Sequence, residues 1–162
     1  HICYLIRNDM VDEFISFIEK KSIKLTSTIN KSIFETNTFL MCKEPTLIEY
    51  AAFFGSINIF QYLLSKKADL SQSLLIYAVH GRKIDIIQFI CNNNRPKVEI
   101  LKECIIESIK CHYNEIVDFM LNNVIQIQID SEEKILLNCL KYSNYRYFPS
   151  VLNLYKAKFF IY

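Results

Sequence analysis

The residues best suited to chemistry in this sequence are its thiols and imidazoles. Cys104 and Cys111 stand seven positions apart, which places both on one face of a helix, and His112 follows directly. Thiolate and imidazole are the ligands that zinc prefers, but a structural zinc site needs four, and no C-x-x-C or H-x-x-x-H pair supplies the others. Since free cysteine is among the most often buried residue types, we interpret these cysteines as core residues and predict no metal site.

Nucleophilic catalysis would need a cysteine or serine beside a histidine that a carboxylate orients. His80 and His112 are the only internal histidines, and no such motif surrounds either one. Phosphate-binding loops need several clustered glycines, whereas Gly55 and Gly81 are the only two and stand far apart in the chain. We therefore predict a protein without catalytic activity, cofactor or small-molecule substrate.

The composition predicts one globular domain. The 162 residues are 51% apolar and carry a formal charge of +2, which is too apolar for a disordered chain and too balanced for a strong attraction to nucleic acid or anionic membranes. The longest uncharged run, 50–65, is short and partly polar, so we expect no membrane span. Six cysteines in mostly apolar surroundings indicate reduced thiols and a cytoplasmic location.

Repeated helical elements must position these side chains, because the sequence aligns with itself. Segment 50–64 aligns without gaps with 77–91, and the same register recurs at 107–121, at 138–152 and, backwards, at 4–18. In each repeat two short runs show apolar residues at helical spacing, which predicts two amphipathic helices joined by a tight turn. The five predicted repeats cover about 1–21, 45–69, 72–94, 101–125 and 132–157, and positions 22–44 form an insert.

The core positions of this register can be counted. Four positions of each second helix, at i, i+3, i+6 and i+7, should share one face, and nineteen of the twenty residues there are apolar or aromatic, Asn114 being the exception. Thr46 and Ser73 precede two of the first helices as expected N-caps. Because a helix pair this short cannot bury its apolar face alone, neighbouring pairs must stack, which predicts an all-α solenoid. We expect the array to continue beyond the ends of this chain.

At this register the sequence resembles the ankyrin repeat. Residues 46–60 are similar to the signature T-P-L-H-x-A-A-x-x-G-x-x-x-I-V, with matches at the Ala51–Ala52 pair and at Gly55. Leu47 and Glu49 stand where proline and histidine are usual. The whole looks like the divergent ankyrin-like domains of parasitic protists, and steps shorter than an ankyrin unit of about 33 residues imply short or absent β-turn fingers. The resemblance implies protein binding and carries over no catalytic motif.

One row of equivalent positions is a candidate contact surface. It lies two residues beyond the core alanine position of the first helix, and four of its five members are basic or can become so. Stacked repeats would align these positions into a stripe that receives acidic side chains or phosphates, although a solvated charged face would look the same in the sequence. We predict that a protein partner binds the face of the stacked first helices and loops through Arg7, Phe53, His80, Lys110 and Lys141.

The C-terminal repeat suggests an alternative function. From Lys134 onward the chain has five basic residues and no acid, and tyrosines interleave with them, a pattern typical of binding to single-stranded nucleic acid. Tyr145 and Phe148 already occupy core positions, so we favour a protein partner and keep nucleic-acid or anionic-surface binding as the alternative.

The insert 22–44 offers a second surface. Long irregular segments in compact domains are often binding loops or covers. We expect Phe34 and the run Phe39-Leu40-Met41 to tuck onto the first helix pair, with a free binding loop as the other interpretation.

Overall fold

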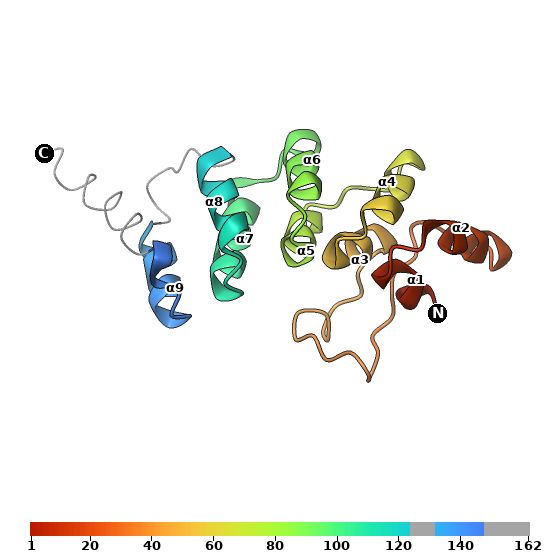
Figure 1. Ribbon diagram of the computed structural model, residues 1–162, viewed down its shortest axis with the longest axis horizontal. Coiled ribbons are helices and arrows are strands. Elements are labelled where there is room, and N and C mark those ends of the chain that lie inside the picture. Colours follow the sequence, from red (N-terminus) through yellow and green to blue (C-terminus); the bar gives the residue numbers. More distant parts are fainter. Residues whose placement is uncertain (124–131, 148–162) are drawn as a thin grey trace, which may run out of the picture. The chain divides into compact units, whose positions relative to one another are not determined.

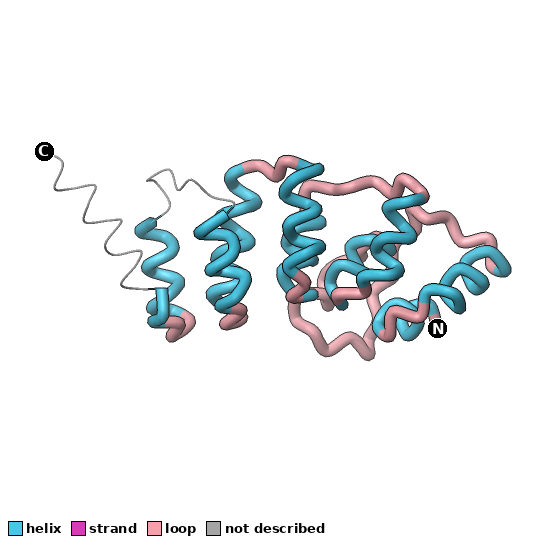
Figure 2. The backbone as a smooth tube through the Cα atoms, turned by 45° about the horizontal axis from the view of Figure 1, so that its top comes forward, coloured by secondary structure: helices cyan, strands magenta, loops and turns pink. Residues whose placement is uncertain are grey.

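The computed structural model describes residues 1–123 and 132–147, and within these ranges the regular structure is helical (Figure 1). The chain divides into two compact units, residues 1–94 and 95–162, called here the N-terminal and the C-terminal unit. None of the described helices has the length and apolar character that crossing a bilayer requires. Helix pairs connected by loops recur along the chain, as the coloured tube in Figure 2 shows.

The N-terminal unit contains three helix pairs. Its first helices pack side by side in the order α1, α3, α5, and the second helix α2 packs on α4. The helices are α1 (Ile2–Arg7), α2 (Val11–Lys20), α3 (Leu47–Phe54), α4 (Ile57–Ser65), α5 (Leu74–Gly81) and α6 (Ile84–Asn94).

The C-terminal unit is built around α7 (Val98–Lys110), which packs against α8 (Asn114–Asn123) and α9 (Glu132–Lys141). A short 3₁₀ turn, η2 (Tyr145–Tyr147), follows α9 and contacts it. The expected second helix of the fifth repeat continues beyond η2, so most of it lies outside the described residues.

In the four described helix pairs, and between α9 and η2, the turn contains one residue in the left-handed conformation. Only glycine adopts this conformation without a steric penalty of about 1 kcal/mol, yet four of the five residues are not glycine. Their spacing along the chain is the same as the spacing at which the sequence aligns with itself. The described chain is therefore built of similar helix pairs, whose turn residues are Asp9 (φ 51°), Gly55 (66°), Arg82 (55°), His112 (56°) and Ser143 (56°).

The predicted core positions of the first helices are buried. Ile6, Ala52, Val79 and Ile109 lie at equivalent positions and are almost inaccessible to solvent. Leu140, at the same position of α9, departs from the pattern and is 49% exposed. The buried face of α9 carries Ile135 and Cys139 instead, which are one helical turn apart.

Between α3 and α5 the two backbones approach too closely for side chains. A Cβ atom added to Gly81 would lie 2.0 Å from the carbonyl oxygen of Ala52, and one added to Gly55 would lie 2.7 Å from that of Gly81. Both glycines are therefore required by packing, and Gly55 also by its positive φ.

The buried carboxylate of Glu49 connects α3 to the start of α5 through hydrogen bonds. Thr46 caps α3 as predicted, because its Oγ1 accepts from the backbone N–H of Glu49 while the Glu49 side chain accepts from the N–H of Thr46. Glu49 Oε1 also accepts hydrogen bonds of 2.7 Å from the hydroxyls of Ser71 and Ser73. Ser73 does stand at the N-cap of α5, but its hydroxyl binds Glu49 and makes no cap bond.

Hydrogen bonds at equivalent positions join other pairs. The Ser56 hydroxyl donates to the carbonyl oxygen of Ile6, and in the C-terminal unit the Asn144 amide donates to that of Ile109 at 3.1 Å. In both cases the residue after the left-handed turn donates to a carbonyl near the end of the first helix of the preceding repeat, and this carbonyl also accepts from the backbone N–H of its own turn.

Candidate functional site

The insert crosses the first helices of the N-terminal unit on its way from α2 to α3. Its two ends are held together by backbone hydrogen bonds from Ile29 to Pro45 (2.7 Å) and from Leu47 to Ser27 (3.2 Å), around an antiparallel bridge between Thr28 and Thr46. The insert is thus an irregular loop with a closed base.

The ring of Phe39, from the insert, occupies an aromatic slot that we define as Phe53, Tyr77 and His80. It stacks on Phe53 with 5.8 Å between ring centroids, meets Tyr77 edge-on at 5.2 Å, and lies 4.4 Å from His80. The Lys43 ammonium group sits 4.8 Å from the Phe39 centroid. Offset and edge-on aromatic pairs contribute interaction energy in addition to the burial of apolar area, so the slot favours an aromatic ring as its occupant.

A second attachment lies four residues earlier in the insert. Glu35 accepts a 3.0 Å hydrogen bond from Arg7 Nη2, while Arg7 Nε donates to the Tyr50 hydroxyl at 2.8 Å and the guanidinium lies 4.7 Å from the Phe54 centroid. Burial raises the pKa of Tyr50 to about 12, although the bond from Arg7 works against this rise. Burial lowers the pKa of Arg7, but Tyr50 and Glu35 outweigh it and raise that pKa overall.

An Asx turn connects the two attachments. The backbone N–H of Asn37 donates to Glu35 Oε1 at 2.8 Å, and Asn37 Oδ1 accepts from the backbone N–H of Phe39 at 2.9 Å. The segment Glu35–Phe39, called here the anchor segment, is therefore a local structure that presents a carboxylate and an aromatic ring at a fixed separation.

A cleft of about 280 Å³ separates the insert from α1 and α3. The helices contribute Cys3, Arg7 and Tyr50 to its lining, and the insert contributes Ile29, Phe34 and Leu40. The insert also contributes Lys31, Glu35 and Lys43, so the walls combine apolar and aromatic surface with charged groups of both signs.

The predicted contact row is divided between the two units. Phe53 and His80 meet in the aromatic slot, with 4.8 Å between their ring centroids, while Arg7 pairs with the insert. In the C-terminal unit, Lys110 forms a 3.1 Å ion pair with Glu107, and the Lys141 ammonium lies 5.1 Å from the Tyr142 centroid. The bond to Glu107 raises the pKa of Lys110, so this side chain stays cationic in the physiological range.

The expected position of the insert needs correction. Leu40 is buried, as expected, and lines the cleft beside α1. Phe39 instead packs on α3 and α5, because the aromatic slot lies there and not on the first helix pair. Phe34 and Met41 remain exposed.

Sequence reasoning did not identify Glu35 and Lys43 as members of this site. Both residues belong to the insert, which lies outside the repeated helices, so the repeat pattern carries no signal for these contacts. A local signal is Asn37, because asparagine side chains often accept a hydrogen bond from the backbone N–H two residues further on, in an Asx turn.

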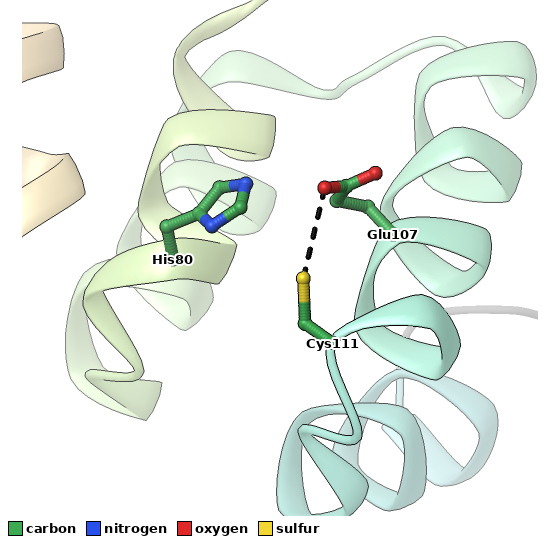
Figure 3. Close-up of side chains that lie close together, drawn as sticks. All are labelled: His80, Glu107 and Cys111. Atoms are coloured by element: carbon green, nitrogen blue, oxygen red, sulfur yellow. Dashed lines mark hydrogen bonds between the residues drawn. The ribbon is translucent and has the colours of Figure 1, made fainter. Parts of the chain in front are cut away.

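The thiols and imidazoles of the C-terminal unit make local contacts. Cys104 is buried in α7, and the Cys111 thiol donates to Glu107 Oε1 at 3.7 Å (Figure 3). Burial, with the nearby Glu107 carboxylate, raises the pKa of Cys111 to about 11, so the thiol is protonated at neutral pH and a weak nucleophile. His112 Nε2 lies 3.0 Å from the Tyr142 carbonyl oxygen. All six cysteines lie in the described ranges as free thiols.

The basic residues of the C-terminal repeat are only partly described. Arg146 forms a 2.9 Å ion pair with Asp118, which offsets its charge, and Lys156 and Lys158 lie outside the described residues. Nucleic-acid or anionic-surface binding through this repeat stays a prediction.

Residues 65–151 match the family described as Domain of unknown function (DUF3447). Because the match spans more than half of the chain, the chain belongs to this family. No curated protein and no solved structure matches it.

Proposed function

We propose that this member of the DUF3447 family is an ankyrin-like solenoid that works as a non-catalytic protein-binding module in the cytoplasm. Paired helices with a left-handed turn at repeat spacing support the ankyrin-like assignment, as do first helices that pack side by side in the N-terminal unit. The steps between successive turns from Gly55 onward are shorter than an ankyrin unit of about 33 residues, which agrees with reduced β-turn fingers.

One observation carries the functional part of the proposal: the first-helix face of the N-terminal unit already holds an irregular peptide segment. Phe39 occupies the aromatic slot and Glu35 pairs with Arg7, so this face has both an apolar site and a charged site for a chain that is not part of the helices. Buried aromatic anchors beside an arginine are the typical hot spots of protein interfaces.

The insert covers the row in the N-terminal unit, so the test uses the exposed lysines of the C-terminal unit. We expect a protein captured from source-cell extract by the wild type to bind the Lys110→Glu, Lys141→Glu double variant at least tenfold more weakly, because charge reversal replaces attraction by repulsion. Direct titration with the captured protein measures the change in Kd.

The matched control reverses the same number of charges at the C-terminal ends of second helices, with Lys20→Glu at the end of α2 and Lys66→Glu directly after α4, both at exposed positions. Retained affinity in this control and loss in the first variant would support the first-helix face. Equal affinities in both variants would show that the face is wrong, and a wild type that captures nothing would contradict the proposed function itself.

A further inference from the structure

The slot residue Phe53 is buried although its position in the repeat is a surface position. Its equivalents Arg7, Lys110 and Lys141 are exposed, whereas Phe53 is 6% exposed. The ring of Phe39 stacks on it at an angle of 14°, so the insert supplies part of this burial. Without the insert, the first-helix face would present an aromatic patch, which is the usual mark of an interaction site.

The anchor segment makes two contacts of different chemistry. The carboxylate of Glu35 meets the guanidinium of Arg7, which the Tyr50 hydroxyl holds through Nε, and the ring of Phe39 enters the slot. The hydrogen bonds of Asn37 fix the separation of these groups, so the anchor segment presents to the face a carboxylate and an aromatic ring that are four residues apart.

On either side of the anchor segment the insert is exposed, except at Leu40, which is buried. Ile33 and Phe34, directly before the anchor segment, are 93% and 85% exposed, and Met41 is exposed on its other side. In the ion pair the Arg7 side chain is 45% exposed and the Glu35 side chain 14%, and ion pairs that solvent reaches typically add little to stability. The closed base at Thr28 and Thr46 would keep the insert attached while its anchor segment leaves the face.

We propose that the anchor segment Glu35–Phe39 is a built-in, displaceable occupant of the first-helix face of the N-terminal unit. This inference rests on the proposed function. It assigns to the face a protein partner with a carboxylate four residues before an aromatic ring. Such a partner competes with the insert, whose high effective concentration keeps the face closed until the partner replaces it.

The test uses a fluorescent peptide with the sequence of residues 31–43, carrying Cys42→Ser to prevent oxidation. Its Kd is measured by fluorescence anisotropy for the wild type and for the Phe39→Ala variant of the whole chain. We expect at least tenfold tighter binding to the variant, because its slot is no longer filled and the binding-competent state is more populated. Peptides carrying Phe39→Ala or Glu35→Ala should bind the variant at least tenfold and about threefold more weakly, respectively.

The matched control is Phe34→Ala, which removes an equally large ring from an exposed position of the same insert and should bind the peptide like the wild type. A Glu35→Ala variant of the chain opens the other attachment without removing apolar surface, and it should bind the peptide about threefold more tightly than the wild type. Helical circular dichroism confirms that each variant is folded.

Three results would overturn the proposal. The first is equal affinity of the wild type, Phe39→Ala and Glu35→Ala chains, or no binding by any of them. The second is a wild-type dimer that dissociates when Phe39 is replaced by alanine, because this result would show that the insert of a second copy occupies the face. The third is binding of a single-stranded oligonucleotide in place of the peptide. If capture of a protein still depends on Lys110 and Lys141 in any of these cases, the proposed function stands and only this inference fails.

Discussion

At the junction between α3 and α5 two backbones touch, whereas between α7 and α9 side chains form the junction. Gly81 and Gly55 leave no room for a Cβ atom in the N-terminal unit. At the α7–α9 junction the residue equivalent to Gly81 is Tyr142, whose carbonyl oxygen lies 3.0 Å from His112 Nε2, and the amide of Asn144 donates to the carbonyl of Ile109. The same left-handed turn thus supports two kinds of junction, and the one made by side chains accepts more residue types.

The largest effect should come from Gly81→Ala. The added methyl group would overlap the Ala52 carbonyl oxygen, so we expect the free energy of unfolding to fall by about 3 kcal/mol or more. Urea denaturation followed by circular dichroism measures the change. Tyr142→Ala, at the equivalent position of the α7–α9 junction, leaves the backbone carbonyl in place and should cost about 1 kcal/mol or less. Similar losses in the two variants would remove the distinction between the junctions.

The next effect concerns the buried carboxylate. Glu49→Ala leaves the hydroxyls of Ser71 and Ser73 without their acceptor and removes half of the capping box, so we expect a loss of about 2–3 kcal/mol in urea denaturation. In the C-terminal unit Glu107→Ala breaks a more exposed ion pair with Lys110 and should cost about 1 kcal/mol or less. A larger loss for Glu107 than for Glu49 would contradict this ranking.

The smallest effect tests whether the turns are alike. Ser143 has a φ of 56°, which disfavours any residue with a Cβ atom, so Ser143→Gly should raise the free energy of unfolding by about 0.5–1 kcal/mol. Ser143→Ala keeps the Cβ atom and should give no gain. Thermal unfolding of both variants measures the difference, and equal stability of the two would show that this turn is not strained.

The sequence predicted the helix pairs because their cause is periodic. Positions such as Ala52 and Val79 recur at helical spacing on a buried face, and the Thr46 cap depends on a glutamate only three residues away. The left-handed conformation at Arg82 and Ser143 was not predicted, because neither residue type favours it and the packing of the helix pair imposes it.

The candidate site was predicted only where it follows the repeat. Arg7, Phe53 and His80 could be aligned by the repeat, but the insert that packs on them could not be placed. Phe39 belongs to this aperiodic insert and is distant in sequence from the three rings of the aromatic slot. Ser73 shows the same limit on a smaller scale. The residue type and position of Ser73 both indicate an N-cap. Its hydroxyl instead donates a hydrogen bond to the carboxylate of Glu49, from the preceding repeat.

The closed base of the insert has a consequence for how this protein can vary. Because the bridge between Thr28 and Thr46 fixes where the loop leaves and rejoins the helices, the chain between them can change length without moving α2 or α3. Each doubling of a flexible loop costs only about 0.6 kcal/mol in closure entropy. The insert is thus a natural place for relatives, or for an engineer, to graft a different recognition sequence onto an unchanged helical frame.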